Sequence, residues 1–167
     1  GKGGKGKIVH RELRLEDLYT GYRQNVMAQD EVLAWIKVPK AVANERSRVY
    51  KISKRFEDDI SAVCLALNLH IADGVVQQAS IGVGGVAATP VRARKTEAAL
   101  AGQAWTADTV MAAMATLRAE FSPISDMRAS SAYRTEVLGN LLQRYWLESQ
   151  GLAAINLESF ALEGEAA

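Results

Sequence analysis

The most regular hydrophobic pattern of the chain lies between residues 60 and 72. Large apolar residues alternate there with small or polar ones: Val63, Leu65, Leu67, Leu69 and Ile71 against Ala62, Cys64, Ala66, Asn68 and His70. Side chains of a β-strand point alternately to the two faces of a sheet. This period of two therefore predicts a strand with one apolar and one lighter face. The apolar face suits a covering layer of helices.

The dipeptide Asp73-Gly74 follows this strand and is typical of a type I′ hairpin turn, in which both central residues need a positive φ. We therefore expect residues 75–83 to return as an antiparallel strand. The remaining pattern predicts extended stretches at 8–13, 31–38 (ended by Pro39) and 46–54, and a helical turn at 15–23 stopped at Gly21.

After Pro90 the pattern becomes helical. Residues 91–100 predict a first helix, and Thr106 can cap a second that runs to about Phe121 with apolar residues at i, i+3, i+4 and i+7. Ser130 or Ser131 can cap a third. Strands first and helices last predict an α+β fold, with an antiparallel sheet of three to four strands and about three helices packed on one face.

Composition agrees with an ordinary globular domain. The chain has 167 residues, 49% hydrophobic and 23% charged, which excludes a disordered chain and a disulfide scaffold. No apolar run reaches the roughly 20 residues of a membrane span. The single Cys64 is typical of a reducing compartment, so we expect a cytoplasmic protein. The chain begins at Gly1 without Met, which suggests a piece of something larger.

Charge is unevenly distributed along the chain. Residues 1–55 carry 13 Lys/Arg against 6 Asp/Glu, or +7, and residues 56–167 carry 7 against 13, or −6. The basic part could meet an anion or an acidic partner, although a solvated surface is the simpler interpretation. A nucleic-acid partner is disfavoured, because aromatic residues are not interleaved with the basic ones and no helix has a basic face.

Three motif-like patterns favour plain structural interpretations. GKGGKGK (residues 1–7) has Walker spacing, but Ile8 stands where a Ser or Thr is needed, so a flexible lead-in is expected. GVGGVA (residues 82–87) fits a dinucleotide motif, but Pro90 delays the required helix and a strand end is expected. Cys64 and His70 lie about 20 Å apart along one strand. We predict no metal site and no catalytic residue.

Two polar segments leave alternatives open. Residues 51–61 place three cations directly before three acids, which fits either a solvated loop or the mouth of a ligand site. Residues 121–134 combine Arg, Asp and hydroxyl side chains, and could either dock a partner or connect and cap two helices.

Five stretches in order resemble one family: LYTGYR (18–23), EVLAWIKVP (31–39), YKISKRFEDDISAV (50–63), GGVAATPVRARKTEAALAG (84–102) and SDMRASSAYR (125–134). Together they resemble the C-terminal part of the FAD-binding subunit of molybdenum hydroxylases, with the bacterial xanthine dehydrogenase small subunit and the carbon monoxide dehydrogenase flavoprotein as examples. The resemblance covers nearly the whole chain after Lys7.

The resemblance implies a domain division and four site residues. Residues 1–39 would end the FAD-binding domain, 40–157 would form the flavoprotein C-terminal domain, and 158–167 a loose tail. Leu33 would lie against the isoalloxazine ring and Lys51 near the flavin carbonyls. Arg55 and Asp58 would belong to a loop at the flavin edge that controls NAD access, where Phe56 departs from animal members.

The resemblance also implies a function. In the complete enzyme, electrons from a purine substrate would pass through molybdopterin and 2Fe–2S centres on other domains or subunits to FAD and then to NAD. The partners would be the preceding FAD-binding domain, the iron–sulfur domain and the molybdenum subunit. The chain alone would neither hold FAD tightly nor turn over substrate. The alternative is a non-catalytic interaction module with no flavin role.

Overall fold

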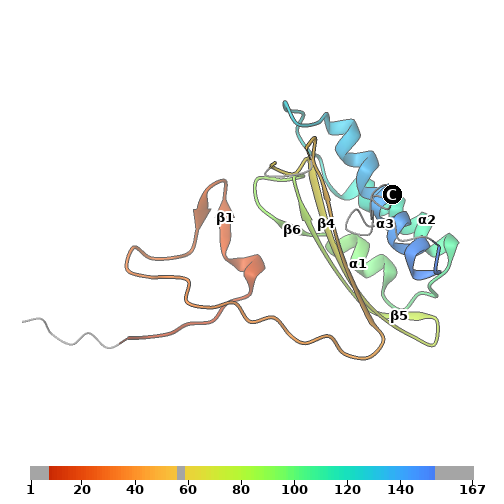
Figure 1. Ribbon diagram of the computed structural model, residues 1–167, viewed down its shortest axis with the longest axis horizontal. Helices are drawn as coiled ribbons and strands as arrows, with labels where there is room; N and C mark the ends of the chain where they lie inside the picture. Colours follow the sequence, from red (N-terminus) through yellow and green to blue (C-terminus); the bar gives the residue numbers. More distant parts are fainter. Residues whose placement is uncertain (1–7, 56–58, 153–167) are drawn as a thin grey trace, which may run out of the picture.

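A computed structural model describes residues 8–55 and 59–152. It consists of an extended segment, residues 8–44 (the arm), and a sheet-and-helix domain, residues 45–152 (Figure 1). Four antiparallel strands are ordered β3-β4-β5-β6: β3 (Glu45–Ile52), β4 (Val63–Ala72), β5 (Val75–Gly84) and β6 (Val91–Arg92). The helices are α1 (Arg94–Leu100), α2 (Ala107–Glu120) and α3 (Ser131–Ser149). The predicted α+β class is confirmed.

Strand β4 has the predicted two faces. Val63, Leu65 and Leu69 are 0% exposed and belong to the core cluster that the helices cover. At its end, Asp73 and Gly74 have φ values of 52° and 73°, as the hairpin turn requires. The period-two pattern therefore gave both the strand and the face that is buried.

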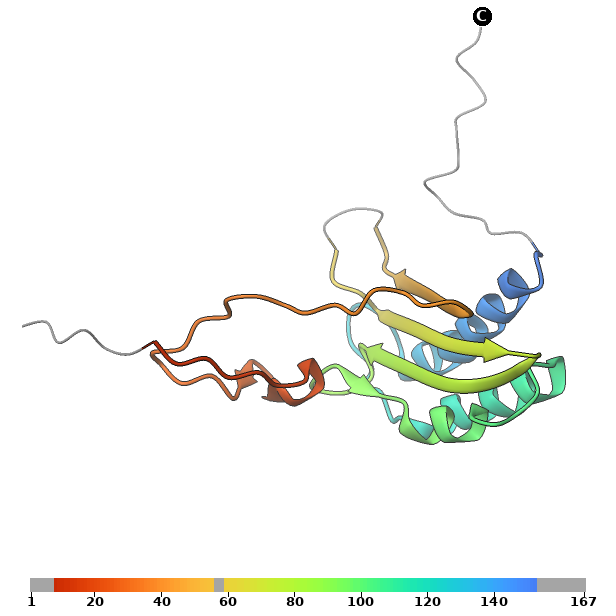
Figure 2. The same cartoon turned by 90° about the horizontal axis from the view of Figure 1, so that it is seen from below.

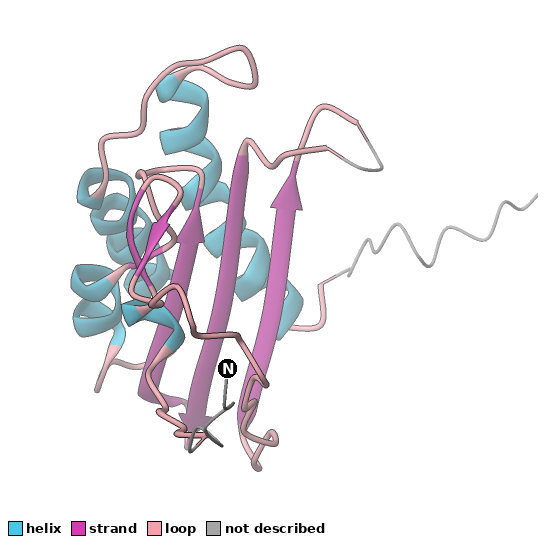
Figure 3. Ribbon diagram, turned by 90° about the vertical axis from the view of Figure 1, so that its left-hand side faces the viewer, coloured by secondary structure: helices cyan, strands magenta, loops and turns pink. Residues whose placement is uncertain are grey.

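The strand register sorts side chains into a covered face and a face without helices. Tyr50, Leu65 and Val83 lie in one cross-strand row on the covered face. The next row, Lys51, Cys64 and Gly84, points to the other side, which we call the open face. Figure 3 shows the helices behind the sheet and the arm in front of it, so the arm lies on the side of the open face.

The helices begin where local chemistry satisfies their free N–H groups. The Thr106 side chain accepts from the Thr109 N–H at the start of α2, and Ser130 accepts from the Tyr133 N–H at the start of α3. The first helix was predicted from residue 91 but begins at Arg94, because Val91–Arg92 pair with β5 as a short strand. The Glu120 carboxylate accepts the Lys95 and Thr96 N–H groups of α1.

The strand predicted over residues 31–38 is wrong. That segment has no regular secondary structure, and the arm contains only a short 3-10 helix, η1 (Leu15–Asp17), and a small hairpin of β1 (Tyr19–Gly21) and β2 (Gln24–Asn25). Of the helical turn predicted over residues 15–23, only 15–17 are helical, and 19–21 form a strand of the hairpin. A strand needs a partner for its backbone groups, and residues 31–37 contact residues 10–12 through side chains instead.

These arm contacts join residues 10–12 to residues 31–37. Arg11 pairs with Glu31 at 2.6 Å, Lys37 pairs with Glu12, and the rings of His10 and Trp35 lie 5.2 Å apart. Seen from below, the arm extends away from the sheet and the helices (Figure 2). In the described ranges, no helix combines the length and the apolar character that crossing a membrane would require. Residues 1–7, Asp58 and the predicted tail 158–167 lie outside these ranges.

Candidate functional site

Lys51 lies on the edge strand β3, at the end of a cross-strand row on the open face. It is exposed, and it lies in register with Cys64 on β4, which is opposite Gly84 on β5. Burial raises the pKa of the Cys64 thiol, and the Lys51 ammonium works against that rise. The row therefore presents the Lys51 ammonium group, the neutral Cys64 thiol and the backbone of Gly84, which has no side chain.

The open face is nearly flat around Lys51 because the side chains next to Lys51 are small. Ala66 and Gly82 lie opposite each other in the adjacent row, and a Cβ placed on Gly84 would stand 3.5 Å from the Cys64 Cβ. Val49, next to Ala66, is 68% exposed. This surface can receive a flat, largely apolar group with negative charge at one point.

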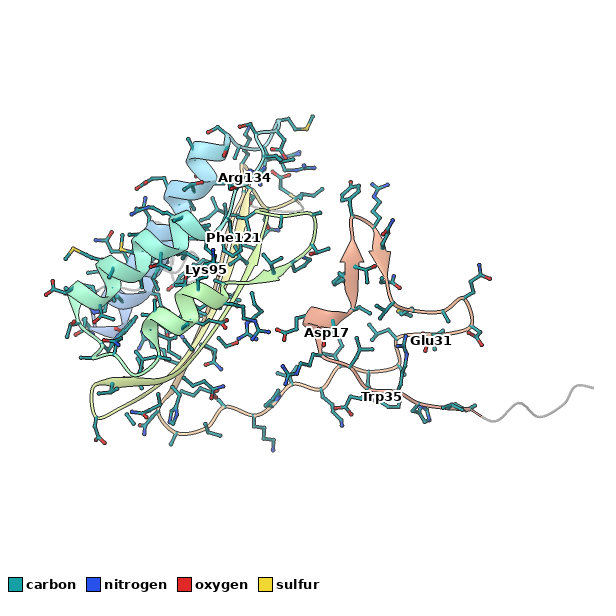
Figure 4. The ribbon with its side chains drawn as sticks, turned by 180° about the vertical axis from the view of Figure 1, so that it is seen from behind. Asp17, Glu31, Trp35, Lys95, Phe121 and Arg134 are labelled. Atoms are coloured by element: carbon teal, nitrogen blue, oxygen red, sulfur yellow. The ribbon has the colours of Figure 1, made fainter. Side chains whose placement is uncertain are left out.

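Leu33 is on the arm, where its side chain is 60% exposed. Glu31 and Trp35 flank it in sequence, and Figure 4 shows both standing apart from the sheet. The structure thus places Leu33 and Lys51 on two different parts of the molecule, with the arm on the open-face side of the sheet.

The loop after β3 starts with a set of local contacts. Arg55 lies 3.7 Å from Asp59 with its side chain 79% exposed, so this ion pair adds little stability. Lys54 Nζ donates to the Met127 carbonyl at 2.7 Å, which ties the loop to the segment before α3. Of the two interpretations of residues 51–61, these contacts agree with the solvated loop. Asp58 lies outside the described residues.

Arg134 is buried and makes three polar contacts, and sequence patterns did not single it out. It is 3% exposed and donates to the carbonyls of Ala62 and Gly85, the latter at 2.8 Å, and to Asp126 Oδ1 at 2.6 Å. Gly85 has φ +84°, and a Cβ there would collide with the Ala62 carbonyl. The GVGGVA stretch is therefore a strand end with close backbone contact, as predicted.

Asp126 organises the segment between α2 and α3. The Arg128 N–H, with the Ala129 N–H and Arg134, lowers the pKa of Asp126 to about 2 although burial opposes the shift. Together with the Ser130 cap, this shows that residues 121–134 connect and cap two helices. Beside them is an open pocket of about 420 Å³, flanked by Ile52 and Tyr133.

A model of the CO dehydrogenase flavoprotein C-terminal domain matches residues 48–149. The chain belongs to this family. The matched residues run from β3 to the end of α3, so the family domain is the sheet-and-helix domain, and the arm lies outside the match.

Relatives of this flavoprotein domain are parts of much longer proteins. A nicotinate hydroxylase of Emericella nidulans is 34% identical over 79% of this chain and 10% of its own length. A xanthine dehydrogenase of Calliphora vicina is 33% identical over 60% of this chain and 8% of its own length. The chain thus spans about a tenth of these curated relatives.

A solved structure shares the fold. The carbon monoxide dehydrogenase from Hydrogenophaga pseudoflava that lacks the Mo-pyranopterin moiety of the molybdenum cofactor matches with a TM-score of 0.73 and 28% identity, over 83% of this chain and 48% of that chain. This match extends over more of the chain than the family domain does.

Tyr50 and Glu148 join β3 to α3 on the covered face of the flavoprotein domain, and no sequence pattern predicted their contact. Tyr50 donates to Glu148 Oε2 at 2.9 Å, and Arg144 Nε donates to Glu148 Oε1 at 2.8 Å. Burial alone would raise the pKa of Glu148, but these two donors hold it below its ordinary value. The contact fixes α3 across β3, directly beneath the strand that carries Lys51.

Proposed function

We propose that this chain is the C-terminal part of an FAD-binding subunit in a molybdenum hydroxylase of the xanthine dehydrogenase type. Residues 40–157 form the flavoprotein C-terminal domain, and residues 1–39 are the end of the FAD-binding domain. The domain covers one side of the isoalloxazine ring and docks to the other subunits. Membership of the flavoprotein C-terminal domain family supports this proposal.

The observation that carries the proposal is the open face with Lys51 on it. Around Lys51 this face carries alanine, glycine and an exposed valine, whereas further along the strands it carries Ser47, Asn68 and Ser80 and is polar, as the uncovered face of an antiparallel sheet usually is. The part around Lys51 can therefore receive a flat, largely apolar group. The arm, on the same side of the sheet, exposes Leu33, Trp35 and Ile36 by 57% or more.

The residues present fit a flavin ring. When bound, FAD supplies hydride and single-electron chemistry that no side chain of this chain can perform. Lys51 stabilises negative charge that gathers at the ring's N1 and C2 carbonyl edge, because an ammonium near an anion favours the charged form. Leu33 provides an apolar contact for the ring, and Arg55 with Asp58 belongs to the loop through which NAD approaches.

The complete enzyme supplies the rest of the electron path. In the complete enzyme, molybdopterin and 2Fe–2S centres on other domains or subunits would supply electrons from a purine-like substrate to FAD, and FAD would supply them to NAD. A xanthine dehydrogenase and a carbon monoxide dehydrogenase among the similar proteins support this assignment. A single free cysteine agrees with a cytoplasmic location.

The Lys51→Met variant of the complete flavoprotein tests the proposal, with Lys54→Met as matched control. Removal of the ammonium lowers the flavin midpoint potential by on the order of 30 mV, the equivalent of about 1.4 kcal/mol for two electrons. Lys51→Arg restores most of that loss, and Lys54→Met leaves the potential unchanged. An unchanged potential in Lys51→Met refutes the flavin-wall role.

Titration of the isolated chain with FAD tests whether this chain can bind FAD without the preceding part of the flavin domain. The groups that hold the pyrophosphate belong to the preceding part of the flavin domain, so we expect no saturable binding at micromolar FAD. Sub-micromolar affinity contradicts this expectation.

An interaction module without a flavin role is the second candidate, favoured by the exposed apolar side chains of the arm. It predicts that Lys51→Met leaves the flavin potential unchanged while arm substitutions such as Trp35→Ala weaken assembly.

A further inference from the structure

The arm touches the sheet-and-helix domain through a small set of contacts. Among the large apolar side chains of the described arm, Leu18 is the buried one, at 9% exposure. It follows η1 directly, and the same 3-10 turn carries Glu16. The two ion pairs that the structure gives between the arm and the domain both come from this turn, besides the backbone that leads into β3.

Glu16 makes two ion pairs with the domain. Its Oε2 lies 2.9 Å from Arg92 Nη1, and its Oε1 lies 2.7 Å from Arg94 Nη2. The Glu16 side chain is 21% exposed, so these contacts are partly shielded from solvent. A third cation, Arg14, stands 3.5 Å from the same carboxylate but belongs to the arm itself.

Arg92 connects this contact to the core. Its Nε lies 2.6 Å from Glu97 Oε1, and Glu97 is 8% exposed. The same carboxylate oxygen accepts the backbone N–H of Ile81 on β5 at 2.7 Å. A continuous chain of hydrogen bonds thus runs from a central strand through Glu97 and Arg92 to Glu16 on the arm.

An arginine suits the centre of such a chain. The guanidinium is planar and rigid and offers separate edges to two carboxylates, whereas a lysine ammonium is one point charge on a flexible stem. Glu97 is already held by the Ile81 N–H, so Arg92 has little freedom to turn away from Glu16. Glu97 orients Arg92, and Arg92 orients the arm.

We propose that Glu16, Arg92 and Glu97 form an ionic joint that sets the position of the arm relative to the open face of the sheet, with Arg92 as its central positioning residue. The significance of that position rests on the proposed function, because the arm carries Leu33 and the sheet carries Lys51. The joint itself is a property of this chain and requires no flavin.

A distance measurement between two spin labels tests the joint in the 167-residue chain. Cys64→Ser removes the native thiol, and cysteines at Val32, which is 83% exposed, and at Ala112 on α2 receive the labels. A second pair at Gln77 and Ala112 reports on the domain alone. Each pair is measured in the starting chain and in Arg92→Met, Arg92→Lys and Arg14→Met.

We expect Arg92→Met to widen the distance distribution between arm and domain about twofold, because a local contact is lost while the core stays folded. Arg92→Lys gives an intermediate width. Arg14→Met leaves the width unchanged, and the Gln77–Ala112 distribution is the same in all variants.

An unchanged distribution between arm and domain in Arg92→Met overturns the inference. So does an equal widening of the Gln77–Ala112 pair, since Arg92 would then support the whole fold rather than the arm. Because no flavin is present, a failure of the Lys51 test leaves this result standing, and a failure here leaves the Lys51 test valid.

Discussion

In the sheet-and-helix domain, the large apolar side chains of β4 are mostly buried, whereas those of the arm, Leu18 apart, are exposed to solvent. Leu65 and Leu69 are 0% exposed, but Val32 and Val38 of the arm are 83% and 80% exposed. Both regions are rich in apolar residues, so composition does not separate them. They differ in what covers them: β4 has strands on both sides and helices on one face, whereas the arm makes side-chain contacts to itself and the Glu16 ion pairs to the domain.

The difference shows which part of the chain buries enough apolar surface to be stable by itself. Burial of apolar surface is the main stabilising contribution to a fold, so the domain can hold itself together while the arm depends on something outside it. Exposed apolar surface of this extent marks an interaction surface. For a flavoprotein C-terminal domain, the preceding FAD-binding domain is the partner that we propose.

The largest effect is expected from Arg134→Met in the domain. The change strands the carbonyls of Ala62 and Gly85, and we expect a loss of about 3–5 kcal/mol in the free energy of unfolding, measured by urea titration. Arg128→Met is the matched control: its pair with Asp126 is long, at 3.5 Å, and should cost less than about 1 kcal/mol. Equal losses in the two variants would contradict the central role of Arg134.

A pair of leucine truncations sharpens the comparison directly. Leu142 is 0% exposed, so Leu142→Ala should cost about 2–5 kcal/mol through lost burial and a cavity. Leu33→Ala on the arm should change the stability of this chain by less than about 0.5 kcal/mol. A large loss in Leu33→Ala would show that the arm packs against the domain in solution.

Acid should act on the domain through Asp126. Its pKa is lowered from 3.8 to about 2, so its carboxylate stabilises the folded chain above pH 4, and this contribution is lost as the pH falls from about 4 towards 2. Asp126→Asn should therefore show a flatter dependence of unfolding free energy on pH in that window. The same slope in both proteins would remove Asp126 from the acid response.

The smallest effect is expected from the arm's own ion pairs. Lys37 and Glu12 pair with side chains that are 69% and 68% exposed. Lys37→Met should leave the free energy of unfolding, measured by urea titration, unchanged within about 0.5 kcal/mol, because exposed pairs contribute little. A larger shift would indicate that the two arm segments fold cooperatively with the sheet.

Local patterns predicted the domain well because its elements are specified by nearby residues. The alternation along residues 63–72, the Asp73-Gly74 turn, and the Thr106 and Ser130 caps each use a rule that spans a few positions. The same reasoning failed for residues 31–38, where an apolar stretch has no strand to pair with. A strand is a property of two segments, and one segment cannot reveal that its partner is missing.

Local sequence patterns could not predict the buried polar contacts of Tyr50, Glu148 and Arg134. Tyr50 and Glu148 are 98 positions apart, and Arg134 joins Ala62, Gly85 and Asp126 from three separate segments. No periodicity links such residues. Leu33, Lys51, Arg55 and Asp58 came from a family resemblance instead, and their roles at the flavin stay predictions until the potential of the Lys51 variant is measured.

The outer position of β3 has a consequence for how the protein behaves in a crowded solution. This strand ends the sheet, so one row of its backbone N–H and C=O groups is available to another chain. Arg46, Arg48 and Lys51 along it repel an identical strand that approaches edge to edge. This positive charge disfavours the extension of one copy's sheet by the β3 edge of another copy.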